Sequence, residues 1–142
     1  EATAICTSWQ TEMDMVLAGL DIVALPSHNE GTPVSLIEAQ AAAKPVVSTN
    51  VGGVADVVKD NQCGFITEPN DIDIFAEALL QLINKPELRT YFGTQGRNFV
   101  QSKYSYQRLV GDMSEYYYSL LDQKKVDYRS RRGRPVPAFL EE

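Results

Sequence analysis

Short apolar runs alternate with longer helical patterns along this chain, and this alternation restricts the possible folds more than any other feature. The apolar runs are rich in β-branched residues and cover 21–26, 45–49 and 64–67. The helical patterns cover 33–43, 54–58, 71–84, 86–103 and 105–122. Strands that alternate with helices form βαβ units, in which neighbouring strands run parallel. The sequence therefore predicts an α/β fold with a parallel sheet flanked by helices.

Two of the helical patterns have a predicted apolar face. In 71–84, Asp71 is placed to cap the helix, and the face consists of Ile72, Phe75, Ala76, Leu79, Leu80, Leu82 and Ile83. In 105–122, the apolar side consists of Leu109, Met113, Tyr116, Tyr117, Leu120 and Leu121. Such periodic positions usually pack against a protein core.

Composition excludes several classes of protein. The chain has 142 residues, 44% of them apolar, which suits one globular domain with a real core. No apolar run approaches the roughly 20 residues of a membrane-spanning helix. The two cysteines, Cys6 and Cys63, suit a reducing compartment better than a disulfide scaffold. The single histidine, His28, excludes a multi-histidine metal site.

Charge is distributed unevenly along the chain. Residues 1–123 carry 7 basic and 16 acidic side chains, which argues against a nucleic-acid partner. Residues 124–142 carry 6 basic and 3 acidic side chains together with two prolines. We expect this tail to be disordered. The alternative is peripheral contact with an anionic membrane face.

The segment 26–40 carries the chemistry. A strand ends there, a loop with Gly31 follows, and a helix begins with Thr32 as the predicted N-cap and Pro33 in the first helical position. The first amides of a helix have no helical partner and bind anions such as phosphate. Gly31 permits close approach of a ligand to the backbone, and the Ser35 hydroxyl is a further donor.

Two carboxylates accompany this anion site. Glu38 belongs to a helix that is otherwise apolar or small and is expected to be mostly buried, and its i±4 neighbours, Val34 and Ala42, offer no ion pair. Acceptance of hydrogen bonds from two ribose hydroxyls would explain it, as in dinucleotide-binding folds. Glu30 would lie on the sugar side of the phosphates. The simpler alternatives are an edge-of-helix carboxylate for Glu38 and a loop charge favoured near a helix start for Glu30.

Glu30 and Glu38 form an E-x7-E motif that resembles the one in retaining glycosyltransferases of family 4, which have the GT-B fold. The same family is resembled by the strand and helix around this motif. It is also resembled by residues 44–47 and by segment 50–53, which contains the Gly52-Gly53 pair. The resemblance covers about residues 5–121. It implies a Rossmann-like sheet that forms the C-terminal half of a GT-B fold.

The resemblance also implies roles for individual residues. Glu38 would bind ribose and Glu30, as a catalytic residue, the transferred sugar. Backbone amides would hold the diphosphate and sugar at Gly31, Thr32, Val34 and Ser35. Trp9 and Gln10 would line the base, although a surface or core tryptophan is an equal alternative. Gly52 and Gly53 would lie beside the site, or form a plain turn.

The implied activity is hexosyl transfer in polysaccharide or glycolipid biosynthesis. The donor would be a nucleotide-diphosphate sugar and the acceptor a saccharide or lipid-linked hydroxyl. The resemblance implies no cofactor and no metal, and capping explains the spacing of Asp71 and Asp73. It implies a cytoplasmic location, at the inner face of the membrane if the tail binds lipid.

The chain departs from the family pattern at its beginning. The N-terminal GT-B domain and the basic Arg/Lys pair that neutralises the diphosphate have no counterpart here. We therefore expect domain 1–123 to be incomplete at its N-terminus and the chain alone to be inactive. The final helix would cross towards the missing domain, so that Tyr116, Tyr117 and Tyr118 contact it or pack in the core. The functional alternatives are a stand-alone donor-binding subunit of a split glycosyltransferase and a nucleotide-binding α/β module without transferase activity.

Overall fold

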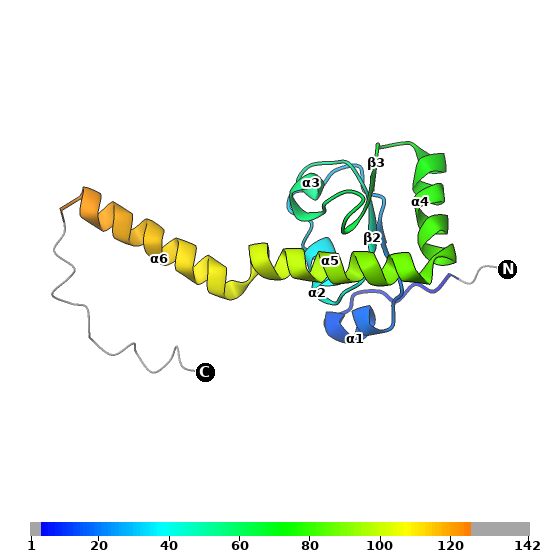
Figure 1. Ribbon diagram of the computed structural model, residues 1–142, viewed down its shortest axis with the longest axis horizontal. Helices are drawn as coiled ribbons and strands as arrows, with labels where there is room; N and C mark the ends of the chain where they lie inside the picture. The colour runs from blue at the N-terminus through cyan, green and yellow to red at the C-terminus, as the bar shows by residue number, and fades with distance from the viewer. Residues whose placement is uncertain (1–3, 126–142) are drawn as a thin grey trace. The chain divides into compact units, whose positions relative to one another are not determined.

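The computed structural model describes residues 4–125, which fall into two compact units (Figure 1). The first unit ends at Ser105 and the second begins at Tyr106. The basic tail predicted from residue 124 lies almost wholly outside the described residues, so its disorder and its membrane contact stay predictions. The predicted domain boundary after residue 123 also stays a prediction.

The first unit is built on a three-stranded parallel sheet with the strand order β1-β2-β3 (Figure 1). The strands are β1 (Val23–Leu25), β2 (Val46–Thr49) and β3 (Gly64–Thr67). Val23 lies opposite Val46, and Val46 lies opposite Gly64. The predicted parallel α/β architecture is therefore confirmed. Strand β1 is shorter than the apolar run 21–26, which ends in a proline that cannot donate to a sheet.

Six helices are described within residues 4–125: α1 (Met13–Ala18), α2 (Val34–Ala41), α3 (Val54–Val57), α4 (Ile72–Asn84), α5 (Pro86–Tyr104) and α6 (Tyr106–Gln123). All but α1 were predicted, with ends shifted by one or two residues. Helix α1 has six residues and buries only Leu17, so it has no apolar periodicity that the sequence could reveal.

The core lies on both faces of strand β2. All four β2 residues are buried, because β1 and β3 flank the strand and helices cover it above and below. Val46 packs with Leu36 of α2 and the buried valines around α3. The next residue, Val47, points to the other face and packs with Leu82 of α4 and Phe92 of α5. This alternation is typical of a sheet with helices on both faces.

The predicted apolar face of α4 is partly wrong. Asp71 caps the helix as predicted, since its Oδ1 accepts a hydrogen bond from the Ile74 amide at 3.2 Å. Ala78 and Leu82 are the buried residues of the helix, and Phe75 and Leu79 are half-buried. Four of the seven predicted core positions are exposed: Ile72, Ala76, Leu80 and Ile83. Only the part of the apolar surface that meets β2 and α5 is covered.

Helix α6 buries none of its residues. Tyr116, Tyr117 and Tyr118 are 59%, 57% and 40% exposed, so the second unit by itself provides no core for this cluster. Their contact with a missing domain stays a prediction. In residues 4–125 we find no helix with the length and apolar character required to cross a membrane.

The two cysteines should differ strongly in reactivity. Cys6 is exposed, whereas Cys63 is 2% exposed. Burial raises the pKa of the Cys63 thiol, although a backbone hydrogen bond from Lys59 and its charge partly oppose this shift. Because the thiolate is the reactive form, we expect iodoacetamide at pH 8 to modify Cys6 at least about tenfold faster than Cys63. Mass spectrometry of timed samples measures both rates, and equal rates in the folded protein would contradict this expectation.

The raised pKa also predicts a pH dependence of stability. A thiol with a higher pKa in the folded protein than in the unfolded chain stabilises the fold below the unfolded pKa. That contribution disappears as the pH rises through the folded pKa. Cys63→Ser should remove this alkaline loss, which urea unfolding at several pH values above 8 can measure.

Candidate functional site

The loop between β1 and α2 ends in an open helix start. Pro33 is the N-cap of α2, with φ −75° and ψ 90°, and its carbonyl accepts hydrogen bonds from the Leu36 and Ile37 amides at 3.1 and 3.4 Å. The predicted N-cap Thr32 and the first helical position of Pro33 are therefore wrong by one residue, because the extended ψ of Pro33 keeps it outside the helix. The amides of Val34 and Ser35 precede the first helical hydrogen bond and are open to an anion.

One face of α2 is exposed along its length. Val34, Ser35 and Glu38 lie on this face, whereas Leu36, Ala39 and Gln40 are buried. The expectation of a mostly buried helix was therefore wrong. The carboxylate of Glu38 shares an exposed surface with the first amides of the helix. Since about 3.6 residues make one turn, it stands one turn from them.

The Gly52-Gly53 pair packs directly against the loop that carries Glu30 and Gly31. The Gly53 amide donates a hydrogen bond to the Gly31 carbonyl at 2.9 Å. Gly52 has φ +51°, and a Cβ atom there would lie 1.7 Å from the Glu30 carbonyl oxygen. A Cβ at Gly53 would lie 2.4 Å from the Gly31 carbonyl oxygen. The two predicted loops therefore touch backbone to backbone, which only glycine permits.

Trp9 and Gln10 lie apart from this arrangement. Trp9 is 88% exposed, so the core alternative for this residue is wrong. The Gln10 side chain donates a hydrogen bond to the Thr7 carbonyl at 2.6 Å. In residues 4–125, no hydrogen bond, ion pair or ring contact links either residue to the loop 26–33. Their role at the base stays a prediction.

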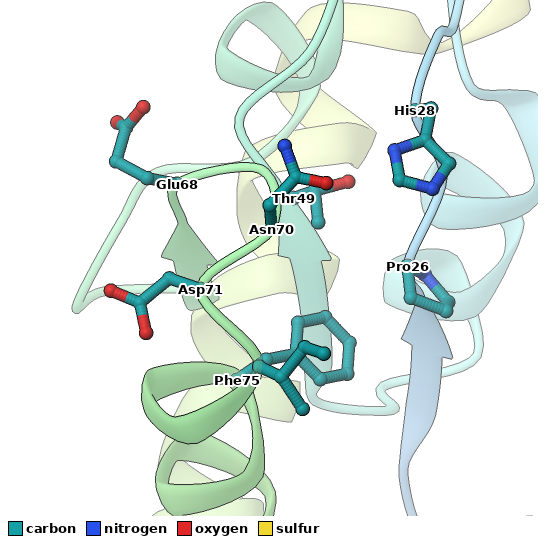
Figure 2. A pocket seen from close by; sticks show the side chains of 8 residues that line it. Pro26, His28, Thr49, Glu68, Asn70, Asp71 and Phe75 are labelled. Atoms are coloured by element: carbon teal, nitrogen blue, oxygen red, sulfur yellow. The ribbon is translucent and has the colours of Figure 1, made fainter.

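A cavity of about 420 Å³ opens at the carboxyl ends of the three strands (Figure 2). Pro26 follows β1, Thr49 ends β2 and Glu68 follows β3, and ligands of parallel sheets bind at this edge. The full lining is Pro26, His28, Thr49, Glu68, Asn70, Asp71, Ile72 and Phe75. Sequence reasoning directed attention to the loops after β1 and β2 but did not find this cavity, because its lining comes from separate segments.

The electrostatics of the helix start come from the backbone. Residues 26–41 contain no lysine or arginine, so within this segment only the backbone amides and the helix dipole favour an anion. Within the described part of the chain, no three histidine, cysteine, aspartate or glutamate side chains gather in a way that could hold a metal ion.

A parallel sheet with a glycine loop and an open helix start at its carboxyl edge is an arrangement typical of α/β proteins that bind phosphorylated ligands. Comparison with known proteins narrows this class. The family model of glycosyl transferases group 1 matches residues 3–99. The chain belongs to this family, as its E-x7-E motif predicted.

Individual relatives agree with this assignment. The capsular polysaccharide biosynthesis glycosyltransferase CapM of Staphylococcus aureus is 36% identical over 106 residues, which are 75% of this chain and 28% of that protein. The chain thus spans less than a third of this relative. The crystal structure of the C-terminal domain of the group 1 protein LpcC from Francisella tularensis is 28% identical with a TM-score of 0.64, covering 72% of this chain and 53% of that one.

A third relative was crystallised with ligands. A mutant of TarM from S. aureus, in complex with Fondaparinux, alpha-GlcNAc-glycerol and UDP, is 30% identical with a TM-score of 0.67. The match covers 72% of this chain and 21% of TarM.

The likeness to the LpcC domain confirms the predicted architecture, the C-terminal half of a GT-B fold.

Proposed function

We propose that this chain is the donor-binding half of a retaining glycosyltransferase and binds a nucleotide-diphosphate sugar at the start of α2. One observation carries this proposal: the open amides of Val34 and Ser35 share an exposed face with the Glu38 carboxylate. An anion-binding helix start and a carboxylate one turn away together match a diphosphate joined to a ribose.

Each part of the donor then has a partner. The amides of Gly31, Thr32, Val34 and Ser35 hold the diphosphate, and the helix dipole stabilises the charge that grows on it as the sugar leaves. Glu38 lies roughly 6 Å along the helix from Val34 and accepts hydrogen bonds from the ribose hydroxyls. Glu30, half-buried in the loop, contacts the hydroxyls of the transferred sugar.

UDP is the favoured nucleotide, because TarM was crystallised with UDP and is 30% identical to this chain. The acceptor would be a saccharide or polyol hydroxyl, in line with the alpha-GlcNAc-glycerol in the same complex. We expect the chain alone to bind donor without transferring the sugar. Residues 26–41 offer no cation to the leaving diphosphate, and that interaction is usually a large part of catalysis.

The proposal predicts that donor binding depends on Glu38. Titration of the ¹⁵N-labelled chain with UDP-glucose, UDP-GlcNAc, GDP-mannose and ADP-glucose should shift amides of residues 31–38 with one donor, at a Kd near 1 mM, or about −4 kcal/mol. Glu38→Gln should weaken this binding about tenfold or more, since hydrogen bonds to a charged group contribute about 1.5–3 kcal/mol.

Glu77→Gln is the matched control, because Glu77 is an exposed glutamate in the middle of α4. It removes the same charge and should leave donor binding unchanged. Equal affinities of the Glu38→Gln variant and the unmodified chain would refute the proposal. If UDP bound as well as UDP-sugars and Glu30→Gln had no effect, the chain would instead be a nucleotide-binding module without transferase activity.

A further inference from the structure

The cavity at the carboxyl edge of the sheet shares the loop after β1 with the proposed donor site. His28 of this loop lines the cavity, whereas none of the residues from Glu30 to Glu38 does. The donor proposal therefore leaves the cavity without a ligand. Its volume of about 420 Å³ lies in the range of small-molecule sites, roughly 300–1,000 Å³.

The lining combines an apolar floor with several polar groups. Phe75, Ile72 and Pro26 supply apolar surface. The imidazole of His28, the hydroxyl of Thr49 and the amide of Asn70 supply hydrogen-bonding groups above the Phe75 ring (Figure 2). Binding sites for small molecules generally have this composition, with a few placed polar groups on an apolar surface.

Two acidic residues, Glu68 and Asp71, line one side of the cavity, and no lysine or arginine lines it. In Figure 2 the carboxylates of Glu68 and Asp71 point away from His28 and Thr49. Both are held in place: Glu68 accepts a hydrogen bond from the Asn50 side chain at 3.1 Å, and Asp71 caps α4. Their negative charge disfavours a phosphate or carboxylate in the cavity, so its ligand should be uncharged.

The end of the sheet has unused hydrogen-bonding capacity. Thr67 lies opposite Thr49 in the register of β2 and β3. Its side chain is buried, and its hydroxyl has no hydrogen-bond partner. A buried hydroxyl without a partner is unfavourable, but Thr67 does not line the cavity, so this hydroxyl is not assigned to the cavity's ligand.

We propose that this cavity is an acceptor subsite that binds one uncharged sugar ring. The less polar face of the ring packs on Phe75 and Pro26, and its hydroxyls form hydrogen bonds with His28 and Asn70. The Thr49 hydroxyl already donates to the Ser27 carbonyl, so it can only accept a hydrogen bond from the ring. This inference rests on the proposed function, because it assigns the ring to the acceptor. The donor sugar is attached to a diphosphate at α2, and its expected contact is Glu30.

The test is a titration of the ¹⁵N-labelled 142-residue chain with methyl α-D-glucopyranoside and methyl N-acetyl-α-D-glucosaminide. We expect saturable shifts of the amides at His28, Thr49 and Asn70–Ile72 with one of them, at a Kd between about 1 and 30 mM. Methyl α-D-glucuronide, the acidic counterpart of the glucoside, should bind at least about threefold more weakly because of like-charge repulsion. Absence of saturable shifts with both neutral glycosides would overturn the proposal.

A pair of asparagine substitutions provides a matched control. Asn70 and Asn61 both have positive φ, +69° and +58°, so glycine can replace either without backbone strain. Asn61 does not line this cavity. Asn70→Gly should weaken glycoside binding about three- to tenfold, as loss of a hydrogen bond predicts, whereas Asn61→Gly should leave it unchanged. Equal affinities of the two variants would contradict the assigned contact.

Two further results separate this proposal from the donor proposal. Glu38→Gln should weaken UDP-sugar binding and leave glycoside binding unchanged, so either site can fail alone. UMP provides the second result, since it carries the base and ribose without a hexose. If UMP shifted the cavity amides and competed with the glycoside, the cavity would be a nucleotide site and the sugar assignment would be wrong.

Discussion

Gly52→Ala should destabilise the first unit by more than about 3 kcal/mol, a large loss for a single methyl group. The added Cβ would lie 1.7 Å from the Glu30 carbonyl oxygen and 2.8 Å from its carbonyl carbon. Backbone atoms cannot rotate away as a flexible side chain can. The positive φ of +51° adds strain for any residue with a Cβ, about 1–2 kcal/mol. The two loops must therefore separate, and the helix start moves with them.

Urea unfolding followed by circular dichroism measures this effect, and a loss of this size should lower the Tm by about 10 °C or more. Gly31→Ala is the matched control in the same pair of loops. A Cβ at Gly31 would meet nothing within 4 Å, so its stability should stay within about 1 kcal/mol of the unmodified chain. If both variants lost the same stability, the backbone contact between the loops would be unimportant.

Gly93→Ala should have the second largest effect, a loss of about 2–4 kcal/mol from overpacking. Gly93 is buried in α5, and a Cβ there would lie 2.1 Å from the carbonyl oxygen of Ala43 and 2.9 Å from its carbonyl carbon. Ala43 belongs to the connection between α2 and β2 and has φ +56°, so this backbone has little freedom to move. Helix α5 would have to withdraw from its place beside α2.

The control is a second helical glycine in an open position. A Cβ at Gly111 in α6 would meet nothing within 4 Å. Alanine favours a helix by about 0.8–1.0 kcal/mol over glycine, so Gly111→Ala should increase the helix signal of α6. Differential scanning calorimetry and circular dichroism of both variants test the contrast. If Gly93→Ala also raised helicity with no loss of Tm, close packing of α5 would not stabilise the fold.

The sequence predicted those features of the fold that local chemistry determines. The three apolar runs became parallel strands because each is short and β-branched and is followed by a turn or a helix start. Asp71 was found as a cap because an acidic side chain three residues before an open amide is a local pattern. The start of α5 at Pro86 was found for a similar reason, since proline suits a first helical turn.

Features that depend on tertiary burial could not be predicted in this way. The exposed and the buried positions of α4 are equally apolar in the sequence. Which of them are buried depends on where β2 and α5 lie in the fold. Helix α1 has too few buried residues for a periodic signal. The exposure of Glu38 was not predicted either, because the apolar and small residues around it in the sequence suggested a mostly buried helix.

The candidate site also contains parts that a local sequence pattern predicts and parts that depend on the tertiary fold. The E-x7-E motif, the glycine loop and the helix start lie within one continuous segment, so the sequence could predict their order and spacing, with the helix start off by one residue. The contact of Gly52 with Glu30 joins two segments but follows from parallel strands whose ends meet at one edge. The lining of the cavity comes from three segments, 26–28, 49 and 68–75, and depends on the orientation of Phe75, so no local pattern contains that information.

The strand order has a consequence for how this domain assembles. Each strand pairs with the next strand in the chain, and each pairing joins residues only about twenty positions apart. The entropic penalty of closing a loop rises with its length, and sheets of distant strands fold slowly. Because each pairing closes only a short loop, the three described strands can pair early in folding, and none of these pairings depends on a segment far along the chain.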